Sequence, residues 1–197
     1  MKSRRTRLAF KDRFTLYYYS KLNQILTFLV PQNKKVLYFG RVIPGVIPQI
    51  VPSNCHFVHK EQYPDIEAVQ ENYTKFSSLE EFVPDDKYDF IILNETIGET
   101  KNICHLLKNI RNACHQHTRI VIIQHNYLWE KPLILAGKLG IINDIKTQNW
   151  ISIRELNSYL NSMGFEHIRS FRNMIFPVKL GFIGPLINLF VELIYYL

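Results

Sequence analysis

The chain has 197 residues, of which 47% are hydrophobic and 21% charged. Chains of this length and composition form one globular domain with a substantial core, which excludes an intrinsically disordered protein. The formal net charge of +7 is concentrated at the amino terminus, because residues 1–13 carry +5 and residues 14–197 only +2. Such a basic arm either binds phosphate groups or is a solvated tail, and the charge alone leaves both open.

The first residues do not form a secretory signal, since only a three-residue apolar stretch (8–10) precedes Lys11. The three cysteines have no disulfide-framework spacing, which suits a reducing compartment. We therefore expect a cytoplasmic protein and leave peripheral membrane contact open.

The first half of the chain reads as a helix followed by short strands. Apolar residues at helical spacing predict a helix over 14–30, which should stop at Pro31. Short apolar runs predict strands at 36–39, 56–58 and 73–76, with a short helix between the last two.

The second half alternates strand and helix more clearly. Continuous apolar runs predict buried strands at 88–94 and 119–124, with an amphipathic helix over 102–114 between them. Ser152 and Glu155 form a capping-box pattern at the start of another helix, which should end at Gly164. We expect this helix to bury four side chains and a final strand to follow at 165–172; the four are Leu156, Tyr159, Leu160 and Met163.

This alternation predicts an α/β fold, a parallel sheet with helices on both faces. Ligands of such sheets bind beyond the carboxyl ends of the strands. The residues that follow 39, 58, 93 and 124 are therefore the candidates for a functional site.

Three pieces of the second half carry a resemblance to a known family: the strand Tyr88–Asn94, the run Asn126–Trp129 after the next strand, and Gln148–Trp150 before the capped helix. With these pieces the chain resembles the class I, Rossmann-like S-adenosylmethionine-dependent methyltransferases, and most closely bacterial members often joined to a glycosyltransferase module. The resemblance implies a methyltransferase-like domain over 14–175, flanked by the arm 1–13 and an apolar segment 176–197.

The resemblance also implies S-adenosylmethionine as the cofactor. We assign its binding to Gly40 and Gly45 in the loop after the first strand, to His59 at the end of the second, and to Asn94 after the fourth. The resemblance gives Glu95, beside Asn94, as a second residue that contacts cofactor or acceptor, although a loop with no direct role fits these two positions equally.

The cofactor loop departs from the family's pattern. Tyr38 stands where the family has an acid before the glycines, and Val42 stands at the second glycine position, where a Cβ hinders close approach of the backbone. His59 replaces the acid that would bind the ribose hydroxyls. Three prolines in residues 40–54 leave room for at most one helical turn, so we expect a compressed first half and a degenerate cofactor site.

The residues expected to bind the acceptor follow the family's pattern more closely than the cofactor loop does. His125 is the one plausible base at neutral pH after the strand at 119–124, and it is our candidate catalytic residue. The resemblance assigns Asn126, Tyr127 and Trp129 to an acceptor pocket, although Trp129 equally fits a residue that caps the core. We expect no metal site, because the cysteine–histidine pairs lack zinc-ligand spacing; the cysteines should be buried, those of the 102–114 helix included.

The segment 176–197 is apolar nearly all round, yet glycines and a proline interrupt it too often for a bilayer span. It fits the domain's own core, a protein partner or a membrane interface. The family's last antiparallel strand is not evident in the sequence, so the sheet is expected to lack it or to be completed by another chain.

Two functions remain open. The first is methyl transfer to an unidentified acceptor of lipid-linked or sugar type. The second is a non-catalytic scaffold of the same fold that contacts a partner or membrane through 176–197. A nucleic-acid partner is disfavoured, since basic residues are concentrated only in 1–13.

Overall fold

A computed structural model describes residues 22, 24–31, 33–40, 55–59, 73–75, 82–84, 86–125, 130–138 and 149–170. The arm 1–13, the loop positions Val42, Pro44 and Gly45, the expected helix after Pro64, and the segment 176–197 lie outside these residues. So do Asn126, Tyr127 and Trp129.

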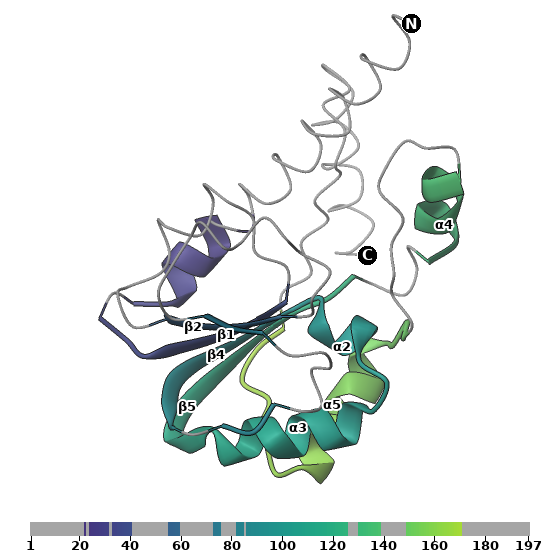
Figure 1. Ribbon diagram of the computed structural model, residues 1–197. Coiled ribbons are helices and arrows are strands. Elements are labelled where there is room, and N and C mark those ends of the chain that lie inside the picture. Colours follow the sequence, from purple (N-terminus) through teal and green to yellow (C-terminus); the bar gives the residue numbers. More distant parts are fainter. Residues whose placement is uncertain are drawn as a thin grey trace, which may run out of the picture.

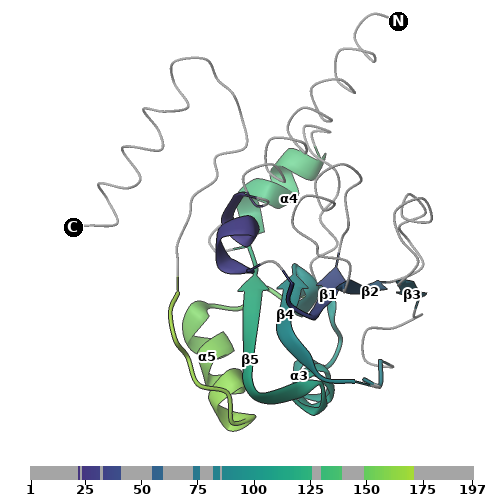
Figure 2. The same ribbon diagram turned by 90° about the vertical axis from the view of Figure 1, so that its left-hand side faces the viewer.

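The described strands form one parallel sheet in the order β3-β2-β1-β4-β5. Their bounds are β1 Val36–Gly40, β2 Cys55–His59, β3 Tyr73–Lys75, β4 Tyr88–Asn94 and β5 Cys114–Ile123. The chain moves outward from β1 to β3 and then crosses back to β4, so the strand order reverses between β1 and β4 (Figures 1 and 2). The predicted α/β fold is confirmed.

Helices cover both faces of the sheet. Residues 22 and 24–29 are helical and lie on one face, while α3 Ile103–Asn112 and α5 Ile153–Ser162 lie on the other (Figure 1). Two helices were not expected from the sequence, the single turn α2 Thr96–Glu99 and α4 Glu130–Lys138. No helix among the described residues has the length and apolar character needed to cross a membrane.

The core explains why β1 and β4 read as continuous apolar runs. Alternate residues of both strands pack against α3, where Leu106, Leu107 and Ile110 are fully buried. The intervening residues of both strands point to the other face and are also buried. Burial on both faces removes the usual alternation of polar and apolar residues.

The capping of α5 is as predicted. Ser152 accepts a hydrogen bond from the Glu155 amide, and the Glu155 carboxylate accepts one from the Ser152 amide. Gly164 follows the helix with φ 76°, the left-handed conformation expected there.

Four expectations about the second half were wrong. Tyr159 is partly exposed, at 36%, and only Leu156, Leu160 and Met163 of the four expected side chains pack on the core. Residues 165–170 form no strand. Odd-numbered and even-numbered side chains there are both exposed, Ile168 included, so the segment has no buried face. A partly alternating apolar pattern such as that of residues 165–172 forms a strand only where another strand lies alongside to pair with it.

The other two errors concern cysteines. Cys104 is exposed, because it precedes the buried Leu106 by two residues and so faces the opposite side of α3. Cys114 is not helical but begins β5, which starts five residues earlier than predicted. The polar sequence of residues 115–118 concealed this part of the strand.

Candidate functional site

The carboxyl end of β1 lies directly against that of β4. Gly40 pairs with Asn94 in the parallel register and has φ 109°. A Cβ at Gly40 would lie 2.0 Å from the backbone oxygen of Asn94, which cannot move aside. A glycine is therefore required here by the approach of the two strands alone.

Tyr38 and Asn94 form a buried polar pair at this point of strand reversal. Both side chains lie on the same face of the sheet, because the register aligns Tyr38 with Ile92 and Gly40 with Asn94. The Asn94 Nδ2 donates a hydrogen bond of 2.8 Å to the Tyr38 hydroxyl, and the two residues are 1% and 3% exposed. The position two residues before Gly40 thus holds a buried phenol whose hydroxyl is hydrogen-bonded to Asn94.

Glu95 and His125 meet at the ends of β4 and β5. The Glu95 amide donates to the Ile123 carbonyl at 2.8 Å, and Glu95 then turns the chain into α2 with φ 56°. A residue with a Cβ pays about 1 kcal/mol for this left-handed conformation. The turn brings the Glu95 carboxylate to 3.1 Å from His125 Nε2, with both side chains about one-fifth exposed.

The electrostatics of the pair favour a charged imidazole. Burial lowers the pKa of His125, but the hydrogen bond and the negative charge of Glu95 outweigh burial and raise that pKa above its ordinary value. With Nε2–H donated to Glu95, Nδ1 carries the lone pair of the neutral ring. The contact with Glu95 therefore orients the imidazole ring and increases its affinity for a proton.

Asn149 fixes the two segments that carry this pair. Its side-chain amide donates to the carbonyls of Ile97 (3.3 Å) and Thr100 (2.5 Å), and its backbone amide donates to Gly98 (3.0 Å), all in or next to α2. Its own carbonyl accepts from Gln124 Nε2 at 3.3 Å. Asn149 therefore ties the turn after Glu95 to the residue before His125.

Three of the predicted site residues lie at the same edge of the sheet. Gly40, Asn94 and His125 stand at the carboxyl ends of β1, β4 and β5, as expected for a parallel sheet. His59 ends β2 at that edge, but its side chain is outside the described part. Gly45 and the acceptor-pocket residues Asn126, Tyr127 and Trp129 are not described, so their roles remain predictions.

Glu95 was expected near the cofactor or acceptor, but its contact with His125 was not predicted. Asn149 lies in the run 148–150 that carries the family resemblance, yet no role was assigned to it. Its three acceptors are about fifty residues away in sequence, so no local pattern predicted those hydrogen bonds.

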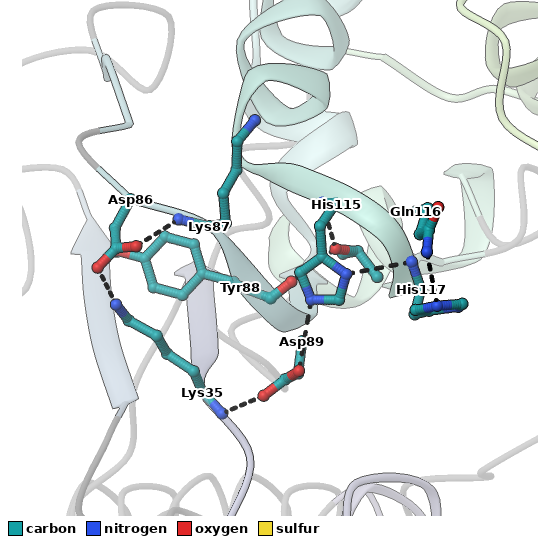
Figure 3. A network of polar contacts seen from close by, with 9 residues as sticks. Lys35, Asp86, Lys87, Tyr88, Asp89, His115, Gln116 and His117 are labelled. Carbon is teal, nitrogen blue, oxygen red and sulfur yellow. Dashed lines mark hydrogen bonds and ion pairs between the residues drawn. The ribbon is translucent and has the colours of Figure 1, made fainter.

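A second polar network lies at the amino ends of the strands, away from this site (Figure 3). The Lys35 amide donates to Asp89 at 2.9 Å, the Lys35 ammonium pairs with Asp86 beside the Tyr88 ring, and His115 Nε2 lies 3.4 Å from Asp89. The pKa of Asp89 is lowered, mainly by the hydrogen bond from the Lys35 backbone amide. These contacts fasten the starts of β1, β4 and β5 together, and no cluster of metal-binding side chains occurs among the described residues.

The fold has solved relatives of low sequence identity. A SAM-dependent methyltransferase from Thermotoga maritima superposes with a TM-score of 0.60 at 17% identity, covering 78% of this chain and 73% of that one. The YcgJ protein of Bacillus subtilis gives 0.53 at 12%, covering 72% and 66%. The plantazolicin methyltransferase BpumL, solved with a substrate analogue and SAH, gives 0.55 at 12%, covering 82% and 69%.

No curated protein matches the sequence. The family comparison is decisive by its extent: residues 21–170, which span the whole described sheet, match the sequence profile described as "Methyltransferase domain". The chain belongs to this methyltransferase domain family, within the Rossmann-like class I fold.

Proposed function

We propose that the chain is an S-adenosylmethionine-dependent methyltransferase whose acceptor is a hydroxyl of a lipid-linked or sugar-type molecule. The observation that carries the proposal is the Glu95–His125 pair at the carboxyl edge, next to the point where the strand order reverses. The acceptor class is suggested by the resemblance of the sequence to members often joined to a glycosyltransferase module. The structure of BpumL with SAH supports the cofactor class.

The bound cofactor supplies an electrophilic methyl group on a sulfonium. For this chain's part, His125 takes the proton of the acceptor hydroxyl at Nδ1, while Glu95 holds the ring through Nε2 and stabilises the imidazolium. Apart from this proton transfer, the protein's contribution is to position the acceptor.

The described residues fit this cofactor if the acid that binds its ammonium group is Glu95, after β4, and not a residue at the end of β1. Tyr38, where the family has an acid, is buried against Asn94 and offers no carboxylate to the ammonium group of the cofactor. Among the described residues at the ends of β1, β4 and β5, Glu95 supplies the carboxylate instead, one strand away. Glu95 and the strand end that carries Asn94 would hold the amino-acid end of the cofactor.

Calorimetric titration of the full chain with S-adenosylmethionine tests the proposal. We expect micromolar affinity for the wild type and a loss of about tenfold or more in Glu95→Gln, because a charged hydrogen bond is removed. Glu166→Gln, an exposed carboxylate beyond α5, is the control and should bind as the wild type does. Absence of heat with the wild type at millimolar cofactor would contradict the proposal.

A second candidate function is a non-catalytic scaffold of the same fold. The buried Tyr38–Asn94 pair favours it, because a phenol fills the position of the family's cofactor-binding acid. Contact with a partner or membrane would then be made by 176–197, outside the described residues. The same titration separates the two candidates, and deletion of 176–197 should abolish the contact while leaving a folded protein.

A further inference from the structure

One face of α4 presents two apolar side chains between two lysines. Lys131, Ile134, Leu135 and Lys138 follow the i, i+3, i+4, i+7 spacing that places residues on one side of a helix. All four are exposed, with Ile134 at 43% and Leu135 at 58%. Glu130 lies to one side of this face in the first turn, so the face itself carries only positive charge.

The helix α4 lies on the same side of the sheet as the candidate site. It begins five residues after His125, beyond the carboxyl end of β5. Both views show α4 standing above the carboxyl edge of the sheet, whereas α3 lies at the opposite end of the view (Figures 1 and 2). A surface bound to α4 would therefore face the carboxyl edge of the sheet.

We propose that the α4 face docks the protein on a membrane surface that carries anionic lipids. Ile134 and Leu135 enter the boundary between headgroups and acyl chains, and Lys131 and Lys138 reach the lipid phosphates on either side. An apolar centre with cationic ends is complementary to such an interface, because its boundary region is apolar and its lipid phosphates are anionic. A protein partner of the same chemistry would need a groove with acidic rims.

The proposal deepens the proposed function, on whose acceptor class it rests: docking through α4 would bring the carboxyl edge to the bilayer, where a lipid-linked acceptor has its headgroup. Its test is independent of that function, because membrane binding requires neither cofactor nor acceptor. Failure to bind cofactor and failure to bind vesicles are thus separate results.

The test is flotation of the full chain with vesicles of phosphatidylcholine, with and without phosphatidylglycerol. We expect binding only when the anionic lipid is present, weakening as salt rises. The double variant Lys131→Gln, Lys138→Gln should lower partitioning roughly thirtyfold, about fivefold for each lysine near the surface. The double variant Ile134→Ser, Leu135→Ser should lower it by about tenfold or more.

Matched controls change other exposed residues of the same kinds, charged and apolar, away from α4. Lys101→Gln, Lys108→Gln removes two exposed charges near or on α3, and Val83→Ser, Ile168→Ser removes two apolar side chains that are each 77% exposed. Neither control should change vesicle binding by more than about twofold, since surface charges act mainly within a Debye length. Equal effects of the control and α4 variants, or α4 variants that bind normally, would place the membrane contact elsewhere and overturn the proposal.

Insertion itself is measured by fluorescence, which keeps the test valid if a serine variant unfolds. Leu135→Trp should give emission that brominated anionic lipids quench, whereas Val83→Trp should give none beyond the signal of the native tryptophans. Unquenched emission from Leu135→Trp overturns the proposal.

Discussion

At the scale of single residues, the Glu95–His125 pair combines an unusual backbone conformation at Glu95 with a raised pKa at His125. A left-handed φ at a glutamate is uncommon and costs free energy, which the contact with His125 offsets. A strained backbone conformation and a histidine with a perturbed pKa are both typical of functional sites.

Glu95→Gln should lower the pKa of His125, because it removes the negative charge that holds this pKa above its ordinary value. The charged pair stabilises the fold below the unfolded pKa of about 6.5 and loses this effect as pH rises through the folded pKa. The wild type should therefore exceed the variant in unfolding free energy most at mildly acid pH, and less above the folded pKa.

Imidazole titration by NMR and urea unfolding at several pH values check this expectation. Glu99→Gln, in the same short helix, is the control and should leave the titration of His125 unchanged. An unchanged His125 titration in Glu95→Gln would show that the pair does not persist in solution.

Gly40→Ala tests the close approach of β1 and β4. The new methyl group would meet the backbone oxygen of Asn94 at 2.0 Å, so we expect a loss of about 3 kcal/mol or more in unfolding free energy. Gly164→Ala is the graded comparison, because it also has positive φ but its methyl group would meet the movable end of Arg111. About 1–2 kcal/mol is expected there, and equal costs for the two variants in urea titrations would refute the explanation.

At the scale of elements, α2 is too short to be stable through its own hydrogen bonds, and Asn149 supplies external ones. A single asparagine therefore decides the conformation of the turn that carries Glu95. The helix α5, by contrast, begins with its own capping box and needs no such help at its start.

Asn149→Ala should leave the carbonyls of Ile97 and Thr100 without their donors and cost about 2 kcal/mol. Hydrogen exchange of the Thr100 amide should accelerate, and the pKa of His125 should fall toward its ordinary value as Glu95 loses its position. Asn161→Ala, an exposed position on α5, provides the control with neither effect. Unaltered protection of α2 would argue against the proposed fastening.

At the scale of the whole molecule, the three cysteines differ in burial. Cys55 lies in β2 and is buried, and burial raises the pKa of its thiol. Burial also raises the pKa of the partly buried Cys114 to about 11, while Cys104 is exposed on α3. Thiolates are the reactive form, so the raised pKa values of Cys55 and Cys114 and the exposure of Cys104 lead us to expect that Cys104 reacts first.

Thiol labelling at pH 8 should therefore show one fast cysteine in the folded protein. The Cys104→Ser variant should lose that phase, and urea should release the other thiols in a single step if the described sheet unfolds cooperatively. Two or more fast thiols in the native protein, measured with a chromogenic disulfide reagent, would contradict the burial of Cys55 and Cys114.

The sequence predicts the parallel α/β fold, the approximate strands and the capped helix, because hydrophobic periodicity and capping depend on residues near one another in the chain. It also placed Gly40, Asn94 and His125 at strand ends, since strand direction alone brings those ends to one edge. The partial exposure of Tyr159, the early start of β5 and the absence of a strand at 165–170 escaped it, because each depends on which neighbour lies alongside.

The contacts between residues at the strand ends depend on the tertiary structure. The Tyr38–Asn94 bond, the contact of Glu95 with His125 and the three hydrogen bonds from Asn149 join residues that are thirty to fifty-six positions apart. Such pairs form only once register and crossover geometry are fixed, and no local pattern encodes them. Composition and periodicity specify the sheet, whereas long-range packing at its carboxyl edge specifies the site.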